Sequence, residues 1–259
     1  MTERAGTAAS ASGPQRAAGT ARTAVVWDAL RSELAGIQRS GGEPLRIVDA
    51  GGGTGGAAVP LAELGHDVTV VDPSPDSLAA LERRAAEAGV RVRAVQGETA
   101  DLAGLLPAGE AHLVLVHNVL EYVEDPAAAL GDIVGVTRPG GAVSVLATNA
   151  VAAVLHRALA GHLGDARSLL DSTDGRWGEG DPMPRRFTAE GLVGLVRAAG
   201  LSDIKVRGVR VFTDLLPGRV FDGDPQAGRE LLELEKSASA HPELSGIATQ
   251  LHLLARRPA

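Results

Sequence analysis

The residues best placed to do chemistry form a glycine-rich segment, Val48-Asp49-Ala50-Gly51-Gly52-Gly53-Thr54-Gly55-Gly56. Glycines carry no Cβ, so the polar groups of a ligand can approach the backbone N–H groups of such a loop. The apolar run Leu45–Ala50 before it predicts a buried strand, and Ala57–Leu64 after it predicts a helix that ends at Gly65. A strand, a glycine turn and a helix in this order indicate a nucleotide-type cofactor site rather than a plain connection.

Two overlapping patterns in this loop predict different cofactors. Three of its glycines satisfy the G-x-G-x-x-G spacing of dinucleotide-binding proteins, which would make the protein an NAD(P)-dependent oxidoreductase. Asp49 followed by alternating glycines forms a second pattern, Asp-x-Gly-x-Gly-x-Gly. Asp72 ends the next predicted strand, Val68–Val71. It would bind ribose hydroxyls with either cofactor, or cap the turn that follows.

Hydrophobic periodicity predicts the elements that position these residues. Further strands are expected at 90–96, 112–117, 142–147, 204–212 and 249–255, and helices at 23–37, 74–88, 126–137, 188–199 and 226–239. Strands that alternate with helices predict right-handed crossovers and an α/β fold, with a parallel sheet covered on both faces. Residues 150–186 interrupt the pattern with one short helical stretch and a polar segment that contains glycine and proline.

Composition excludes several classes of function. The 259 residues carry a net charge of -7 and no cysteine. Disulfides, thiolate nucleophiles and cysteine-ligated metals are therefore excluded, and binding of nucleic acid through overall charge alone is disfavoured. No apolar run reaches the roughly 20 residues that span a bilayer, and residues 1–20 lack the apolar centre of a signal peptide. We predict a soluble cytoplasmic protein with a disordered tail over residues 1–20.

Five segments in register resemble the class I S-adenosylmethionine (SAM) methyltransferases. The Asp-x-Gly-x-Gly-x-Gly pattern resembles their motif I. It is followed by VTVVDPS with Asp72, QGETADL around Glu98, LVHNVLEYVEDP after the fourth predicted strand and RPGGAVSV leading into the fifth. An NAD-binding protein has no reason to carry the last two segments. The resemblance implies SAM as cofactor and a Rossmann-like fold with a mostly parallel sheet and an antiparallel C-terminal strand pair.

Other segments narrow the resemblance. They are RTAVVW at 22–27, HNVLEYV at 117–123, TNA at 148–150, GVRVF at 208–212, LLELE at 231–235 and LHLLARRP at 251–258. In this order they resemble the bacterial tRNA carboxymethoxyuridine methyltransferases, the SmtA-like family, which methylate the carboxylate of a modified wobble uridine. We divide the chain into a SAM-binding core at 21–148, an insertion that faces the substrate at 149–190, and a part that completes the sheet at 191–259.

The resemblance and the local sequence together predict the residues that bind the cofactor. The set is Arg22, Asp49, Gly51, Gly52, Gly53, Asp72, Glu98, Thr99, Ala100 and His117. The resemblance implies that Arg22 contacts SAM, at its methionine carboxylate, and that Thr99 and Ala100 flank the adenine. His117 ends a predicted strand at the sheet edge where α/β proteins bind ligands, with a purely structural histidine as the alternative.

The residues expected to position the methyl acceptor are Asn118, Tyr122, Asn149, His156 and Arg210. A carboxylate acceptor is ionised at neutral pH and needs no general base, which fits a sequence without a catalytic triad pattern or a metal-ligand cluster.

Arg210 would pair with such a carboxylate, or would point outward from its strand. Residues 157–190 hold five arginines against six acidic residues, a poor match to a phosphate-binding surface. A tRNA anticodon loop and a small-molecule carboxylate therefore both stay open as acceptors. A non-catalytic SAM-binding module is a further hypothesis.

Overall fold

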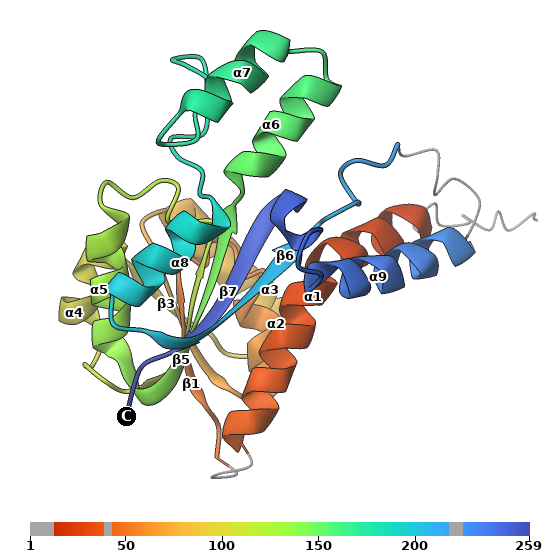
Figure 1. The fold of residues 1–259 in the computed structure, drawn as a ribbon. Helices are drawn as coiled ribbons and strands as arrows, with labels where there is room; N and C mark the ends of the chain where they lie inside the picture. The colour runs from red at the N-terminus through yellow and green to blue at the C-terminus, as the bar shows by residue number, and fades with distance from the viewer. Residues whose placement is uncertain (1–12, 39–42, 218–224) are drawn as a thin grey trace, which may run out of the picture.

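The computed structural model describes the backbone of residues 13–38, 43–217 and 225–259, and the side chains of 23–37, 43–217 and 226–259. Seven strands form one sheet in the order β3-β2-β1-β4-β5-β7-β6 (Figure 1). They are β1 (Arg46–Ala50), β2 (Asp67–Asp72), β3 (Arg93–Gln96), β4 (Ala111–His117), β5 (Thr137–Thr148), β6 (Ser202–Val209) and β7 (Gln250–Arg256). The strands from β3 to β5 pair in parallel, and β7 is antiparallel to both of its neighbours. The expected Rossmann-like fold is confirmed.

Helices cover both faces of the sheet (Figure 1). One face carries α1 (Gly13–Gln38), α2 (Ala58–Glu63) and α3 (Pro75–Glu87), and the other carries α4 (Leu102–Leu105), α5 (Pro126–Val136) and α8 (Ala189–Ala198). The helix α9 (Pro225–Ser239) lies beside α1. The hairpin of α6 (Ala150–Leu159) and α7 (Leu163–Asp171) projects beyond the sheet (Figure 1). None of the helices in the described ranges is long and apolar enough to cross a membrane.

The strands are buried on both faces, which explains their continuous apolar sequences. In β4, Val114 and Val116 pack toward α5 and α8, whereas Leu113 and Leu115 pack toward α1, α2 and α3. Successive side chains of a strand point to opposite faces, so the two halves of the core meet across the sheet. Because the chain is poor in aromatic residues, Val, Leu, Ile and Ala fill both halves.

Side-chain caps start two of the helices that follow strands, α3 and α5. Ser74 Oγ accepts a hydrogen bond from the Ser77 N–H at 3.2 Å at the start of α3. Asp125 Oδ1 accepts from the N–H groups of Ala127 and Ala128 at the start of α5. Such caps satisfy N–H groups that have no partner within the helix, and they determine where each loop turns into its helix.

Several expected boundaries need correction, among them the starts of β3, at Arg93 instead of residue 90, and of β5, at Thr137 instead of residue 142. The helix α1 begins at Gly13, so residues 13–20 are helical rather than part of a disordered tail, while residues 1–12 lie outside the described chain. Alanine has the highest helix propensity and proline is tolerated in a first turn, and this segment contains both. The strand β6 ends at Val209 instead of residue 212, because Arg210 adopts a left-handed φ of +62° that breaks the strand.

The segment 150–186 contains two helices rather than the single one expected, and α7 was missed. Its buried residues, Ala166 and Leu169, are three positions apart, which is too weak a periodicity to stand out in a polar sequence. We call residues 150–187 the cap. The chain returns from α7 through residues 172–187 to the end of β5, where Phe187 N–H donates to the Thr148 carbonyl at 2.9 Å.

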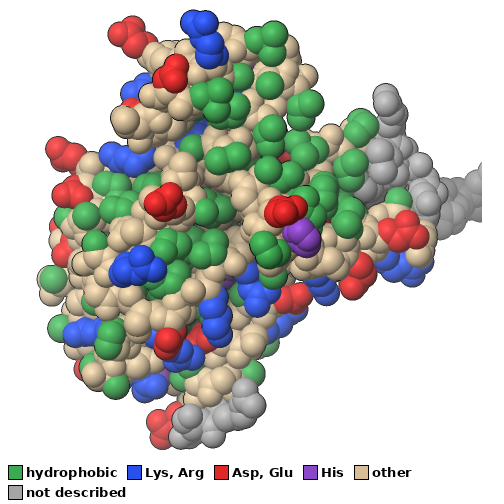
Figure 2. Space-filling view, viewed as in Figure 1, with side chains coloured by type: hydrophobic (Ala, Val, Ile, Leu, Met, Phe, Trp, Pro, Cys, Tyr) green, Lys and Arg blue, Asp and Glu red, His purple; other side chains and the backbone are tan. Residues whose placement is uncertain are grey.

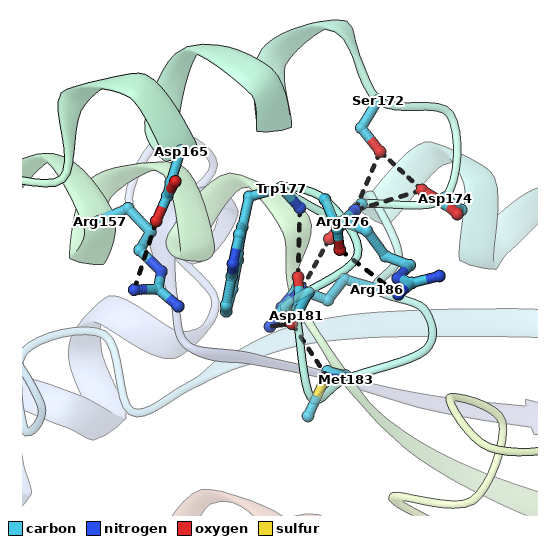
Figure 3. A network of polar contacts seen from close by, with 11 residues as sticks. Arg157, Asp165, Ser172, Asp174, Arg176, Trp177, Asp181, Met183 and Arg186 are labelled. Carbon is cyan, nitrogen blue, oxygen red and sulfur yellow. Dashed lines mark hydrogen bonds and ion pairs between the residues drawn. The ribbon is translucent and has the colours of Figure 1, made fainter.

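A buried ion pair organises the returning part of the cap (Figure 3). The Arg186 guanidinium binds both carboxylate oxygens of Asp181, at 2.6 and 3.0 Å, and the two side chains are only 7% and 0% exposed. The Asp181 carboxylate also accepts from the N–H groups of Trp177 and Met183. Burial opposes ionisation of Asp181, but these hydrogen bonds prevail and lower the pKa of its carboxyl group.

The Trp177 ring lies between two arginines (Figure 3). The guanidinium carbon of Arg157 lies 3.4 Å from the ring centroid, and that of Arg186 lies 4.7 Å away. Arg157 also pairs with Asp165 of α7 at 3.6 Å. Cation–π contacts and ion pairs therefore join α6, α7 and the returning chain into one unit.

Removing one partner of the buried pair should destabilise the protein strongly. We expect Asp181→Ala to lower the free energy of unfolding by about 3–5 kcal/mol, because the Arg186 charge would stay buried without a partner. The matched control is Glu110→Ala, which breaks the exposed Arg46–Glu110 pair and should cost no more than about 1 kcal/mol. Urea denaturation measures both. Equal losses would show that the buried pair does not hold the cap.

A polar chain also crosses the core on the face covered by α1. His117 Nε2 lies 2.8 Å from Ser144 Oγ, which lies 2.8 Å from His252 Nε2. These residues belong to β4, β5 and β7, which are adjacent in the sheet. Burial lowers the pKa of His117 to about 4, and burial with the nearby His117 and Arg207 lowers the pKa of His252 to about 3. Both rings are neutral at pH 7.

The two neutral histidines of this hydrogen-bonded series predict that the free energy of unfolding depends on pH. In the unfolded protein these histidines bind protons below about pH 6.5, whereas in the folded protein they stay neutral to a lower pH. The free energy of unfolding is therefore highest above about pH 6.5 and falls as the pH decreases. Each histidine contributes a slope of up to about 1.4 kcal/mol per pH unit between pH 6.5 and its folded pKa. Urea denaturation at pH 7.0, 5.5 and 4.5 should show a shallower decline for His252→Gln than for the wild type. Identical slopes would contradict the low pKa of His252.

Candidate functional site

The glycine loop lies at the carboxyl edge of the sheet, between β1 and α2, where side chains are excluded. Gly51 has a φ of +72°, and a Cβ on it would lie 2.3 Å from Val119 Cγ2. A Cβ on Gly52 would lie 2.5 Å from the Asp49 carboxylate. A larger residue at either position would collide with its neighbours or strain the backbone. Because the loop carries no side chains at these positions, a cavity lies on each side of Gly51.

Asp72 ties this loop to the end of β2. Its Oδ2 accepts from the Gly53 N–H and its Oδ1 from the Ser74 N–H, both at 2.9 Å. Asp72 therefore has the turn-capping role, and this role is compatible with the expected cofactor-binding role because each carboxylate oxygen has lone pairs to spare. The side chain borders a cavity and is 8% exposed, so it can accept hydroxyl donors from a ligand.

We call the first space the loop cavity; its volume is about 660 Å³. It lies between Asp72, the 3-10 helix η1 (Thr99–Asp101) and the loop 118–125 that follows β4. Thr99 and Ala100, predicted beside the adenine, and Glu98 all line it. The Glu98 N–H donates to Asp101 Oδ2 at 2.9 Å, so Glu98 also starts η1. This volume suits a nucleoside-sized group.

The second space, the helix cavity, lies on the other side of Gly51 and has a volume of about 470 Å³. It brings together Asp49, Gly52 and His117 with residues that the sequence analysis did not single out, Thr23 and Trp27 of α1. Their signal was present in the RTAVVW segment at 22–27. Arg22 lies in α1, but its side chain is outside the described residues.

Asp49 is an unusual acid, because it is buried beside a second carboxylate. Burial, together with the nearby charge of Asp72, raises the pKa of Asp49 to about 7. A group with this pKa loses its proton readily when a cation binds next to it. The helix cavity therefore offers a latent negative charge at Asp49 and a neutral imidazole at His117.

The loop after β4 connects these cavities to a third, which we call the inner chamber, with a volume of about 380 Å³. Asn118 lines all three spaces and adopts a left-handed φ of +56°. Its Oδ1 accepts from Gln250 Nε2 at 2.5 Å. The other residues of the inner chamber are Glu121, Tyr122, Thr148, Met183, Arg210, Thr249 and Gln250.

Arg210 lies between the helix cavity and the inner chamber. Its Nε donates to Asp214 Oδ2 at 2.6 Å, and Thr249 Oγ1 donates to the same oxygen at 2.8 Å. The outward direction expected from an alternating strand does not apply, because the strand has ended and the positive φ turns the residue toward the site. The ion pair fixes where the guanidinium lies.

A fourth space, the outer chamber, lies under the cap and has a volume of about 370 Å³. It shares Thr148, Met183 and Thr249 with the inner chamber and is also lined by His156. Asn149 borders it, but the amide nitrogen of this residue donates to the Gly246 and Ala248 carbonyls. Its oxygen accepts from the Val151 N–H, so Asn149 caps α6 and anchors η3 (Ser245–Ile247).

Two residues that the sequence analysis did not predict hold the loop after β4 in place. The Arg185 guanidinium donates to the carbonyls of Leu120, Val123 and Glu124 at 2.9–3.3 Å. The buried Glu121 carboxylate accepts from the N–H and the hydroxyl of Thr148. The cap and the end of β5 therefore both determine the shape of a loop that borders three of the cavities.

Known proteins resemble this chain along most of its length. A family model described as a methyltransferase domain matches residues 48–145. The tRNA 5-carboxymethoxyuridine methyltransferases of Escherichia coli O157:H7 and of strain K12 are each 31% identical to the chain over 242 residues, which cover 93% of it and 89% of theirs. The ubiquinone biosynthesis O-methyltransferase of Methylobacterium nodulans is 33% identical over 64% of each chain.

Solved structures share the fold. A SAM-dependent methyltransferase of Thermotoga maritima, a possible histamine N-methyltransferase, aligns with a TM-score of 0.54 at 19% identity over 94% of this chain and 93% of its own. Phosphoethanolamine N-methyltransferase 2 of Haemonchus contortus, in complex with SAM, aligns with a TM-score of 0.55 at 19% identity over 88% of this chain and 53% of its own.

These findings decide between the two cofactors predicted from the glycine loop. SAM is the cofactor, and the hypothesis of an NAD(P)-dependent oxidoreductase is wrong. The glycine loop, Asp72 and the two cavities beside them fit the larger resemblance along the chain. The protein belongs to the class I SAM-dependent methyltransferases, in the family that includes the tRNA 5-carboxymethoxyuridine methyltransferase of Escherichia coli.

Proposed function

We propose that this methyltransferase methylates a carboxylate on an anionic acceptor, and that the acceptor is carboxymethoxyuridine in a tRNA anticodon loop. The observation that carries the proposal is the position of Arg210, on the border between the helix cavity and the inner chamber. The similarity to tRNA 5-carboxymethoxyuridine methyltransferases over most of the chain supports this choice of acceptor.

Different residues around the glycine loop bind different parts of the cofactor. Asp72, Thr99 and Ala100 hold the adenosine part in the loop cavity, and Asp49 and His117 face the amino-acid part in the helix cavity. A cationic amino group beside Asp49 stabilises its carboxylate form and lowers its raised pKa. When bound, SAM would supply a methyl group on a sulfonium, so that an acceptor oxygen can attack the methyl carbon in line while S-adenosylhomocysteine leaves.

The acceptor side needs alignment rather than proton transfer. A carboxylate has a pKa of about 4 and is ionised at neutral pH, so no general base is required. In the proposed arrangement, Asp214 holds Arg210 through Nε and Nη2, and the acceptor carboxylate binds the side of the guanidinium that carries Nη1. Asn118 and Tyr122 border the same chamber and restrict the approach of the acceptor.

The outer chamber favours a negatively charged acceptor. Its lining includes Arg157, Arg186, His156 and His162, and none of the described residues that line it is acidic. Arg186 is neutralised by Asp181, and Arg157 is partly balanced by Asp165. The histidines and the edge of Arg157 still provide donors for the remainder of an anionic acceptor.

A small-molecule carboxylate is the second candidate acceptor. The balance of charge over residues 157–190, five arginines against six acidic residues, favours it over a polyanion. The ubiquinone biosynthesis O-methyltransferases among the relatives act, by their names, on a small molecule. The two candidates share the inner chamber and differ in what the outer chamber and the cap contact.

Loss of the Asp72 carboxylate should weaken cofactor binding. We expect Asp72→Ala to reduce the affinity for S-adenosylhomocysteine by about 1–3 kcal/mol, because charge-assisted hydrogen bonds are lost. Isothermal titration measures it, with NADH as the negative ligand. The exposed Asp76→Ala, four residues along the chain, is the matched control and should bind like the wild type. Unchanged affinity of Asp72→Ala would contradict the ribose assignment.

Loss of Arg210 should affect the acceptor more than the cofactor. We expect Arg210→Ala to lower kcat/KM for tRNA that contains carboxymethoxyuridine by about 10- to 100-fold and to leave the affinity for S-adenosylhomocysteine nearly unchanged. Transfer of a radioactive methyl group from SAM to this tRNA measures the first quantity. The exposed Arg229→Ala in α9 is the matched control.

Three outcomes of this experiment would change the proposal. Equal losses of turnover and of S-adenosylhomocysteine binding would make Arg210 a structural or cofactor residue. If wild-type protein methylates small carboxylates and leaves the tRNA unmodified, the second candidate is correct. Binding of S-adenosylhomocysteine without transfer to either acceptor class would support the non-catalytic module.

A further inference from the structure

The polar chain from His117 to His252 is directional, because it contains one hydroxyl between two neutral rings. Each gap, from His117 Nε2 to Ser144 Oγ and from there to His252 Nε2, is 2.8 Å. The Ser144 hydroxyl has a single hydrogen, so it donates to one ring and accepts from the other. Only two arrangements of protons are possible, and they give His117 opposite tautomers.

The buried end of the chain selects between these arrangements. His252 is 1% exposed, and its Nδ1 is buried without a hydrogen-bond partner among the described residues. A proton on this Nδ1 would be an orphaned buried donor, which folded proteins avoid more strictly than an unused acceptor. The proton of His252 therefore belongs on Nε2, from which it is donated to Ser144 Oγ.

The remaining protons follow from this choice. Once Ser144 Oγ accepts from His252, its hydroxyl must donate to His117 Nε2, and the proton of His117 must sit on Nδ1. His117 lines the helix cavity beside Asp49 and Gly52, and its Nδ1 is not among the atoms buried without a partner. The free edge of this ring can then act as a hydrogen-bond donor to a ligand.

We propose that Ser144 and His252 are positioning residues that lock His117 as its Nδ1–H tautomer, so that it presents a neutral donor to an oxygen of the SAM amino-acid part. The inference rests on the proposed function, in which His117 faces that part of the cofactor. A neutral donor holds such an oxygen without repelling the nearby sulfonium and ammonium, as an imidazolium would.

The apolar residues around His117, Ser144 and His252 indicate that these three polar residues have a functional role. Leu115, Leu146 and Leu254 lie on the same face of the same three strands and belong to the apolar core. Placing two imidazoles and a hydroxyl among them costs desolvation that leucine or valine would avoid. Departures of this kind from an apolar core are expected at functional sites. The partner that orients a histidine ligand also sets which nitrogen carries the proton.

Nuclear magnetic resonance of protein labelled with ¹⁵N-histidine tests the tautomer directly, before any cofactor is added. Long-range ¹H–¹⁵N correlations distinguish an Nδ1–H ring from an Nε2–H ring, and the His117→Gln spectrum identifies the His117 signals. We expect Nδ1–H for His117 and Nε2–H for His252 at pH 7. The opposite pair of tautomers, or exchange between the two forms, would overturn the proposal.

Two substitutions of His252 separate positioning from packing. His252→Gln keeps an amide donor near the position of Nε2, whereas His252→Leu removes it. We expect His252→Leu to release the His117 tautomer and to weaken S-adenosylhomocysteine binding by about 10-fold, whereas His252→Gln retains both within about 2-fold. Thermal unfolding of both variants shows that they fold.

The outcomes distinguish this inference from the proposed function. An unchanged His117 tautomer in His252→Leu, or equal weakening of binding in both variants, would overturn the positioning role. Failure of the wild type to bind S-adenosylhomocysteine would overturn the cofactor assignment instead, and the tautomer spectrum of the free protein would still decide the proton arrangement.

Discussion

The hydrogen bond from the Gly53 N–H to the Asp72 carboxylate joins the glycine loop to the end of the neighbouring strand. It requires glycines that let the backbone pass close to Asp49 and Val119, and it requires β1 and β2 to end at the same edge in parallel register. Because Asp72 is held from two sides, its remaining lone pairs keep a constant direction toward the loop cavity. The loop cavity and the helix cavity, on either side of Gly51, depend on this arrangement.

Buried polar groups gather near this edge and have a consistent electrostatic character. Burial raises the pKa of Asp49 to about 7 and lowers the pKa of His117 to about 4 and of His252 to about 3, so at pH 7 Asp49 is about half protonated and both histidines are neutral. A cationic ligand restores the charge of Asp49, whereas the histidines stay uncharged. In the proposed function, a cationic group of the cofactor beside Asp49 would therefore complete its ionisation.

The cap connects the inner and outer chambers to the loop cavity through the loop after β4. Arg186 contacts Asp181 and Trp177 within the returning chain (Figure 3). The adjacent Arg185 binds three carbonyls of the loop after β4. That loop borders the loop cavity through Val119 and the inner chamber through Asn118. In Figure 2 the projecting hairpin carries side chains of both charges and apolar groups, which agrees with the balanced composition of residues 157–190.

The sequence alone determined the order of the strands and of most helices, the glycine loop and the family, because hydrophobic period, caps and turn glycines are local properties. It did not reveal the short helices α4 and α7. Tertiary structure decided what depends on distant partners. Asn149 became an anchor through two carbonyls almost 100 residues away, and Arg210 turned toward the site through a positive φ. The His117–Ser144–His252 chain arises only when three strands become neighbours, with β7 inserted between β5 and β6. The pairing of strands that are remote in sequence depends on the burial of entire sheet faces, so no local sequence pattern predicts it.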